Sequence, residues 1–309
     1  MNRLSNATGG VHVNCPNCGR RIEDRLLAEG HVFCSELCRT SFRPGKVNIP
    51  LLAELVPIGV KPGTMLMVEF DPESQWLSVA ATIAARLYQQ DQFVCYLSMA
   101  RSPEDFKEAL SDLGVDIHSA ENSGRLVVED WYSATLTGGR LASATNQGSL
   151  FEPIRGGLRT RSLKIADLSV EWLKTSKSGP DKIHDIVDYW PTGSMVVVES
   201  FSSILRFNEE KAFVEWMESR VIPEERKGKR ITLQGFVRGI HNEWLYKRME
   251  NASDGVIEIR VMERDDEAKN YIRIRSLKGQ PHDSRWHEVE IQSDGGARLA
   301  QSRKEIHWD

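Results

Sequence analysis

Residues 64–88 read TMLMVEFDPESQWLSVAATIAARLY. The apolar run Thr64–Phe70 predicts a buried strand, and a helix is expected from about Gln75 to Tyr88. Four apolar residues recur there at helical spacing: Trp76, Ala80, Ile83 and Leu87. A strand that is followed directly by a helix is the unit from which parallel sheets are built, so this stretch predicts an α/β domain.

The same alternation continues along the chain. Four further apolar runs predict strands: Phe93–Met99, Arg125–Trp131, Met195–Glu199 and Ile231–Val237. Ser102-Pro103 is a helix start, and Gly114 is placed to end that helix. Asn208 is expected to cap a helix that runs to about Arg220. We therefore predict a doubly covered, mainly parallel sheet.

The C-terminal segments have a different pattern. Val256–Met262, Tyr271–Leu277 and His287–Ile291 alternate apolar and polar residues. Glu258 and Arg260 would face one side, opposite their apolar neighbours. A two-residue period is typical of half-exposed antiparallel strands, so an antiparallel extension of the sheet is predicted.

Four of the five cysteines lie near the N-terminus, as Cys15-x2-Cys18 and Cys34-x3-Cys38. Two such pairs provide the four thiolates that a tetrahedral structural Zn²⁺ prefers. His12 and His31 are possible substitute ligands, and two disulfides or a redox role are the alternatives. Cys95, inside an apolar run, is expected to be a buried core thiol.

Composition bounds the organisation of the 309-residue chain, whose net charge is −4. We expect a flexible tail (1–14), a zinc module (15–45), an α/β domain (46–300) that begins with a short helix over Leu51–Val56, and a C-terminal tail (301–309). The charge gives no general argument for nucleic acid or a membrane surface. No apolar run is long enough to span a bilayer, and no signal peptide is seen, which favours the cytoplasm.

The loop after the first strand is Asp71-Pro72-Glu73-Ser74-Gln75. A phosphate loop at this place needs glycines whose amides converge on the phosphates, a lysine, and a hydroxyl for Mg²⁺. This loop has no glycine and no lysine, its two carboxylates repel phosphate, and its proline lacks an N–H.

Residues 51–298 nevertheless resemble the KaiC-like branch of the RecA-type ATPases. The segments that carry the resemblance are Pro62-Gly63-Thr64, Tyr96-Leu97-Ser98, Ser102-Pro103-Glu104-Asp105, Val196-Val197-Val198-Glu199-Ser200, Asp254-Gly255-Val256-Ile257-Glu258-Ile259 and Lys278-Gly279-Gln280-Pro281-His282-Asp283. Cys15-Pro-Asn-Cys-Gly, Phe33-Cys-Ser-Glu-Leu-Cys and Phe42 are similar to a TRASH-type treble-clef zinc module, a class linked to metal sensing or partner binding.

The resemblance also shows which residues depart from the family pattern. The Walker A lysine and hydroxyl fall on Trp76 and Leu77, and the Walker B aspartate falls on Glu199, which could hold Mg²⁺ through water. The motif's glycines fall on Phe70, Glu73 and Gln75, the catalytic carboxylate pair on Ala100 and Arg101, and the basic pair that reaches a neighbouring subunit on Ser276 and Lys278. Trp76 is then either a plug for the emptied phosphate site or an ordinary amphipathic helix residue.

Other candidate sites are weaker. A basic region comprises Arg155, Arg159, Arg161, Lys164, Lys174 and Lys177, and either nucleic-acid binding or a solvated surface fits it. His282 and His287 lack a nucleophile at a readable spacing and are expected to be loop and strand residues. Arg273, Arg275 and Lys278 share a polar strand face that could meet a neighbouring protomer.

These patterns give a hypothesis of function. The chain is expected to be a cytoplasmic, archaeal-type regulatory or signal-transduction protein, a pseudo-ATPase with structural Zn²⁺ that binds a macromolecular partner, most readily a protein. A RadA-like, nucleic-acid-associated recombinase paralogue is one alternative. A subunit of a mixed ring, which gives Lys278 in trans to an active KaiC-like relative, is another. An enzyme that uses nucleotide in an unusual way is the third.

Overall fold

The computed structural model describes residues 22, 28, 45–132, 161–162, 192–206, 208–264 and 266–300. The four cysteines of the predicted zinc module and both predicted tails lie outside these residues. So do the cations of the predicted basic region, except for the backbone of Arg161.

The described strands form one sheet in the order β10-β9-β8-β7-β1-β6-β5-β2-β3-β4. Their bounds are β1 Met65–Phe70, β2 Val94–Ser98, β3 Leu126–Asp130, β4 Arg161–Ser162, β5 Met195–Val198, β6 Ile231–Val237, β7 Gly255–Arg264, β8 Glu267–Leu277, β9 His287–Ile291 and β10 Ala297–Leu299. The six pairings from β7 through β1, β6, β5, β2 and β3 to β4 are all parallel. The predicted mainly parallel sheet is confirmed.

The antiparallel extension begins one strand later than the sequence pattern indicated. Strand β7 runs parallel to β1, with Val68 opposite Ile257, and is antiparallel only to β8. Glu258 and Arg260 are 4% and 7% exposed, so the prediction of a half-exposed strand was wrong here. The Arg260 guanidinium lies 3.1 Å from the Glu258 carboxylate, and Arg273 and Arg275 also pair with Glu258. Mutual pairing is what allows charged residues to be buried in a strand.

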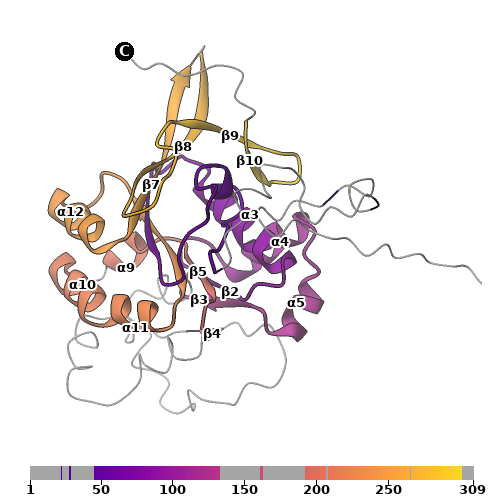
Figure 1. The fold of residues 1–309 in the computed structure, drawn as a ribbon, viewed down its shortest axis with the longest axis horizontal. Helices are drawn as coiled ribbons and strands as arrows, with labels where there is room; N and C mark the ends of the chain where they lie inside the picture. Colours follow the sequence, from indigo (N-terminus) through magenta and orange to yellow (C-terminus); the bar gives the residue numbers. More distant parts are fainter. Residues whose placement is uncertain are drawn as a thin grey trace, which may run out of the picture.

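Helices cover the two faces of the sheet separately (Figure 1). One face carries α3 (Trp76–Gln89), α4 (Pro103–Asp112) and α5 (Ile117–Ser123), together with the 3₁₀ turn Leu52–Glu54. The other carries α9 (Ser202–Leu205), α10 (Glu210–Trp216), a π-helical turn (Met217–Val221), α11 (Ile222–Lys227) and α12 (Glu243–Ala252). Each face has its own apolar cluster of buried residues. No helix among the described residues is long and apolar enough to cross a membrane.

Helix ends follow the sequence signals in one case and depart from them in another. Ser102 caps α4 in a capping box with Asp105, and Gly114 takes a φ of +78° after the helix. Asn208, in contrast, is not a cap: Glu209 holds that position, and the Asn208 amide donates to the carbonyl of Ile204 over 2.9 Å. An asparagine that follows a short helix can donate to a carbonyl of that helix instead of capping the next one, and the sequence pattern does not reveal this nearby acceptor.

The helix expected to end near Arg220 continues through the π-helical turn into α11. Pro223 stands in the first turn of α11. Because proline has no N–H to donate to the preceding turn, the wider π-helical turn before it accommodates the missing bond.

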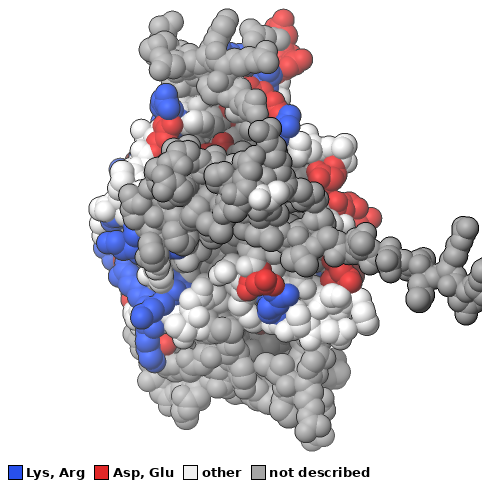
Figure 2. Space-filling model, turned by 45° about the vertical axis from the view of Figure 1, so that its right-hand side comes forward, with Lys and Arg blue, Asp and Glu red and all other residues white. Residues whose placement is uncertain are grey.

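Charge is distributed unevenly over the surface. Figure 2 shows Lys and Arg atoms gathered at the left of the view, while Asp and Glu atoms lie mainly toward its top and right.

The capping box of α4 can be tested by substitution. Ser102→Ala should lower the free energy of unfolding by about 1 kcal/mol, because the Asp105 amide then loses the hydroxyl that accepts from it over 3.1 Å. Ser111→Ala, at an exposed position in the same helix, is the matched control and should be neutral or slightly stabilising. Urea unfolding followed by circular dichroism measures both, and equal effects would contradict the assignment of the cap.

Candidate functional site

The carboxyl ends of four neighbouring parallel strands, β1, β6, β5 and β2, bring three segments together. These are Asp71–Trp76 after β1, Met99–Arg101 after β2, and Glu199 directly after β5. We call them the carboxyl-edge cluster. Ligands of open α/β sheets bind at this edge, and the resemblance places the family's nucleotide there. The sequence-predicted residues of the degenerate site are therefore brought together, apart from Lys278.

The amides of the Asp71–Gln75 loop are largely used within the chain. The Asp71 N–H donates to the Ile259 carbonyl over 3.0 Å, and the Ser74 N–H donates to the Asp71 carbonyl over 3.0 Å. The Gln75 N–H donates to the side-chain oxygen of Asn270 over 2.8 Å. Pro72 has no N–H. Three of the four backbone N–H groups of the loop therefore donate within the chain, so they are not available to converge on a phosphate.

Asp71 also fixes the loop through its side chain. Its carboxylate accepts from the Val261 N–H over 3.0 Å and lies 3.4 Å from the Arg238 guanidinium. These contacts tie the loop to β7 on one side and to the end of β6 on the other. A loop held in this way has little freedom to reorganise around a ligand.

Trp76 closes the edge from the first residue of α3. Its side chain is 1% exposed, and its indole N–H donates to the Glu199 carbonyl over 2.7 Å. The ring centroid lies 5.9 Å from that of Phe70. A buried indole requires an acceptor for its N–H, and the end of β5 supplies one. Trp76, on which the resemblance places the Walker A lysine, is thus part of the hydrophobic core.

Gly235 in β6 makes room for this arrangement. A Cβ atom there would lie 2.2 Å from the Glu199 carbonyl oxygen and 2.9 Å from the indole nitrogen of Trp76. Any side chain at this position would therefore push the indole and the carbonyl apart. Sequence reasoning did not single out Gly235, because a glycine inside a strand indicates a close approach but not which atoms approach.

The Glu199 carboxylate is fully buried and neutralised by the chain. One of its oxygens accepts from the N–H groups of Met99 and Ala100, both over 2.6 Å, and more weakly from Arg101 over 3.4 Å. The other accepts from the Arg101 guanidinium over 3.0 Å, and the exposed fraction of the Glu199 side chain is 0%. Charge-assisted bonds of this kind are what a buried carboxylate needs.

The sequence analysis named Arg101, but it did not predict what the Arg101 side chain contacts. The resemblance places one of the family's catalytic carboxylates there, and the structure shows a cation that pairs with the Walker B-like acid. Burial, and then the nearby Glu199 carboxylate, raise the pKa of Tyr96, so its phenol stays protonated. The surroundings of Glu199 thus contain one cation, a neutral phenol and backbone amides.

Lys278 lies apart from the carboxyl-edge cluster, near the end of α12. Its ammonium donates to the carbonyls of Asn251 and Ser253, both over 2.7 Å, which is a favourable place for a cation. Arg273 and Arg275 pair with Glu258 within the chain, and Arg275 also with Glu250. The predicted contact of these cations with a neighbouring protomer stays a prediction, and it would have to compete with these bonds.

The two histidines have local partners. His282 lies 3.0 Å from the Gln280 carbonyl, and His287, at the start of β9, lies 3.2 Å from the Asp283 carboxylate. Hydrogen bonds from the Arg285 side chain hold the pKa of Asp283 at about 2. Both histidines are thus loop and strand residues, as expected.

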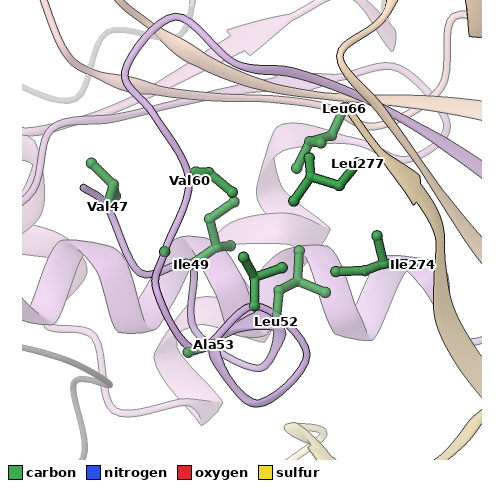
Figure 3. Close-up of a pocket in the computed structure, with 10 residues that line it drawn as sticks. Val47, Ile49, Leu52, Ala53, Val60, Leu66, Ile274 and Leu277 are labelled. Carbon is green, nitrogen blue, oxygen red and sulfur yellow. The ribbon is translucent and has the colours of Figure 1, made fainter. Parts of the chain in front are cut away.

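A pocket beneath the 3₁₀ turn is a second place to look for a ligand (Figure 3). It is lined only by aliphatic residues and a glycine: Val47, Ile49, Leu52, Ala53, Val56, Gly59, Val60, Leu66, Ile274 and Leu277. A nucleotide needs converging polar groups, and this lining offers none. The described residues also contain no group of three His, Cys, Asp or Glu side chains that could hold a metal ion. The four predicted zinc ligands lie outside them.

Comparison with known proteins gives the fold. No family model matches the chain, and no curated protein matches it. Among solved structures, a KaiC-like protein from the hyperthermophilic archaeon Pyrococcus horikoshii is similar, with a TM-score of 0.57 and 18% sequence identity. The match covers 84% of this chain and 99% of that one. The chain has the RecA-like fold of a KaiC-like protein.

The pairing of Arg101 with Glu199 predicts a strong effect of substitution. Arg101→Ala leaves a buried carboxylate without its cation and should lower the free energy of unfolding by about 3 kcal/mol. Arg125→Ala, which removes an exposed pair with Asp91, is the control and should cost about 1 kcal/mol or less. Chemical unfolding measures both. If the two variants lose the same amount, Arg101 does not hold Glu199 as described.

Proposed function

We propose that this chain is a KaiC-like regulatory protein without ATPase activity, which acts by binding a macromolecular partner and carries a structural zinc module at its N-terminus. One observation carries the proposal: the position that the family uses for the nucleotide phosphates is closed by the chain's own groups. Trp76 is buried against the Glu199 carbonyl, and three of the four N–H groups of the loop before it donate within the chain.

Three independent contacts would have to break before a nucleotide could enter. The indole would leave its acceptor, Arg101 would leave Glu199, and the loop would leave Asn270. The Trp76 indole N–H and the Glu199 carboxylate are buried, and leaving such a group unpaired costs about 1–3 kcal/mol or more. The bond to Asn270 is exposed and costs less to break. Nucleotide binding would have to exceed this sum without a lysine or a glycine-rich loop to supply the energy.

A protein partner is supported by the segment that joins β6 to α12. Three large apolar side chains are exposed among the described residues, and two of them, Ile240 (57%) and Trp244 (46%), lie in or directly after this connection. Exposed tryptophan is enriched where proteins meet other proteins. Arg238, in the same connection, pairs with Asp71, so this candidate partner surface is joined to the closed loop.

A nucleotide-binding experiment tests the closed site. The unfolding temperature should stay unchanged in millimolar MgATP, because a ligand at about 100 times its Kd would stabilise the native state by about 2.7 kcal/mol. Phosphate release should equal that of a buffer blank. Differential scanning calorimetry and a phosphate assay measure these, with an active KaiC-like ATPase as the positive control. Phosphate release that Glu199→Ala abolishes in a still folded protein would overturn the proposal.

The zinc module can be tested through metal content. Protein purified without added metal should contain roughly one zinc ion per chain, since four thiolates close a tetrahedral shell. Cys15→Ser together with Cys18→Ser should remove most of it, as measured by inductively coupled plasma mass spectrometry. Cys95→Ala is the matched control, because Cys95 is a buried free thiol of β2, and it should leave the zinc content unchanged.

A further inference from the structure

Cationic side chains gather at the amino edge of the parallel sheet, opposite the carboxyl-edge cluster. We call the following set the basic surface: Lys46, Lys61, Arg226, Lys227, Lys229 and Lys278. All except the half-buried Lys46 are exposed, with the Lys227 side chain at 76% and that of Arg226 at 52%. The residues come from the segments that lead into β1 and β6 and from the end of β8.

Backbone contacts hold these segments together. Gly63, in the turn before β1, packs against the end of α11: a Cβ on it would lie 3.7 Å from the Cα of Arg226 and 3.8 Å from that of Lys229. The turn that Lys61 begins is closed by the Thr64 N–H, which donates to the Lys61 carbonyl. Lys61 and Arg226 to Lys229 therefore form one surface, although they are far apart in the sequence.

Asp254 joins the remaining cations to this surface. Its carboxylate lies 3.3 Å from the Arg226 guanidinium, and its carbonyl accepts from the Lys278 N–H over 2.8 Å. Lys46 donates to the Gln280 side chain over 2.7 Å, which places it beside Lys278. Burial, and then the positive charge of Lys61, lower the pKa of Lys46. The ammonium groups of Lys46 and Lys61 therefore repel each other.

The balance of charge on the basic surface is strongly positive. Among the described residues, two carboxylates pair with its six cations: Glu224 with Lys227 over 3.5 Å, and Asp254 with Arg226. This contrasts with the whole chain, whose formal net charge is −4. Like charges held close together repel one another, and an anionic partner relieves that repulsion.

We propose that the basic surface binds the phosphodiester backbone of double-stranded DNA without reading its sequence. Five of the six cations are lysines, which act as point charges toward phosphates. Among the described residues, the one exposed Phe, Tyr or Trp side chain is Trp244, which lies at the start of α12 after the carboxyl end of β6, so the described part of the basic surface offers no exposed ring on which the bases of a single strand could stack.

The same residues make a protein partner a poor fit for this surface. Protein interfaces are depleted of lysine and depend on a few buried apolar or aromatic anchors. The exposed large apolar side chains of the described residues are Ile240, Trp244 and Ile291, none of which belongs to the basic surface. The DNA duplex is thus a second partner, beyond the protein partner of the proposed function. Its binding does not depend on the closed carboxyl edge, because the basic surface and the carboxyl-edge cluster lie at opposite ends of the strands.

Binding to a short fluorescein-labelled DNA duplex, followed by anisotropy over a range of salt concentrations, tests the inference in the full-length protein. The expected slope of log K against log salt is about −5, since each neutralised phosphate contributes about −0.9. The triple variant Lys61→Glu, Lys227→Glu, Lys229→Glu should weaken binding at least tenfold and make the slope shallower by about 2–3.

A second triple variant provides the matched control. Arg206→Glu, Lys211→Glu, Lys247→Glu changes the net charge equally at exposed positions outside the basic surface and should leave duplex binding within about threefold of wild type. Thermal melting confirms that both variants are folded. Equal loss in the two variants, tighter binding of single-stranded DNA, or competition by polyglutamate as strong as by unlabelled duplex would overturn the inference.

The outcome separates this inference from the proposed function. Duplex binding by a protein that also hydrolyses ATP would overturn the proposed function alone. A protein that binds neither MgATP nor the duplex would overturn the inference alone.

Discussion

The hydrogen bond from the Trp76 indole to the Glu199 carbonyl is the contact on which the carboxyl edge of the sheet depends. It joins the first residue of α3 to the end of β5 across the intervening strand β6. The bond is possible only because residue 235 has no side chain: a Cβ there would lie 2.2 Å from the same carbonyl oxygen. Three residues from distant parts of the sequence therefore form one unit, and the tight strand-to-helix turn that could receive phosphates is closed by the chain itself.

Charge compensation at Glu199 follows from this closure. A carboxylate at the end of an apolar strand, under a buried indole, cannot be left without partners. The segment after β2 supplies them through the amides of Met99 and Ala100 and the guanidinium of Arg101. Where the family pattern places acids that act on a nucleotide, this chain has one small residue and one cation. The indole of Trp76, the amides of Met99 and Ala100 and the guanidinium of Arg101 therefore all bind residue 199.

The sequence predicted the parallel core well, because strands buried on both faces are mostly apolar, as β5 is throughout and β1 is apart from Glu69. It failed at β7, where alternation indicated half exposure although Glu258 and Arg260 are buried as a mutual pair. Periodicity reports polarity, not whether a charge meets a partner. It also failed at Asn208, whose amide has a nearer acceptor than the helix it precedes. For the site, the sequence identified the missing loop chemistry, but which atoms Trp76 and Arg101 contact depends on long-range packing.

The two edges of the parallel sheet have different consequences for function. A RecA-like fold does not by itself imply nucleotide chemistry, because function belongs to sites rather than to folds. At the carboxyl edge of this chain, the Trp76 indole and the Glu199 carboxylate already have partners within the chain, so binding a ligand there requires that existing bonds break. At the amino edge the opposite holds: the side chains of Lys61 and Lys229 are exposed and hold no ion pair with another described residue, so a polyanion could bind them without loss of an internal contact. Binding of a polyanion at the amino edge therefore breaks fewer internal bonds than binding of a ligand at the carboxyl edge.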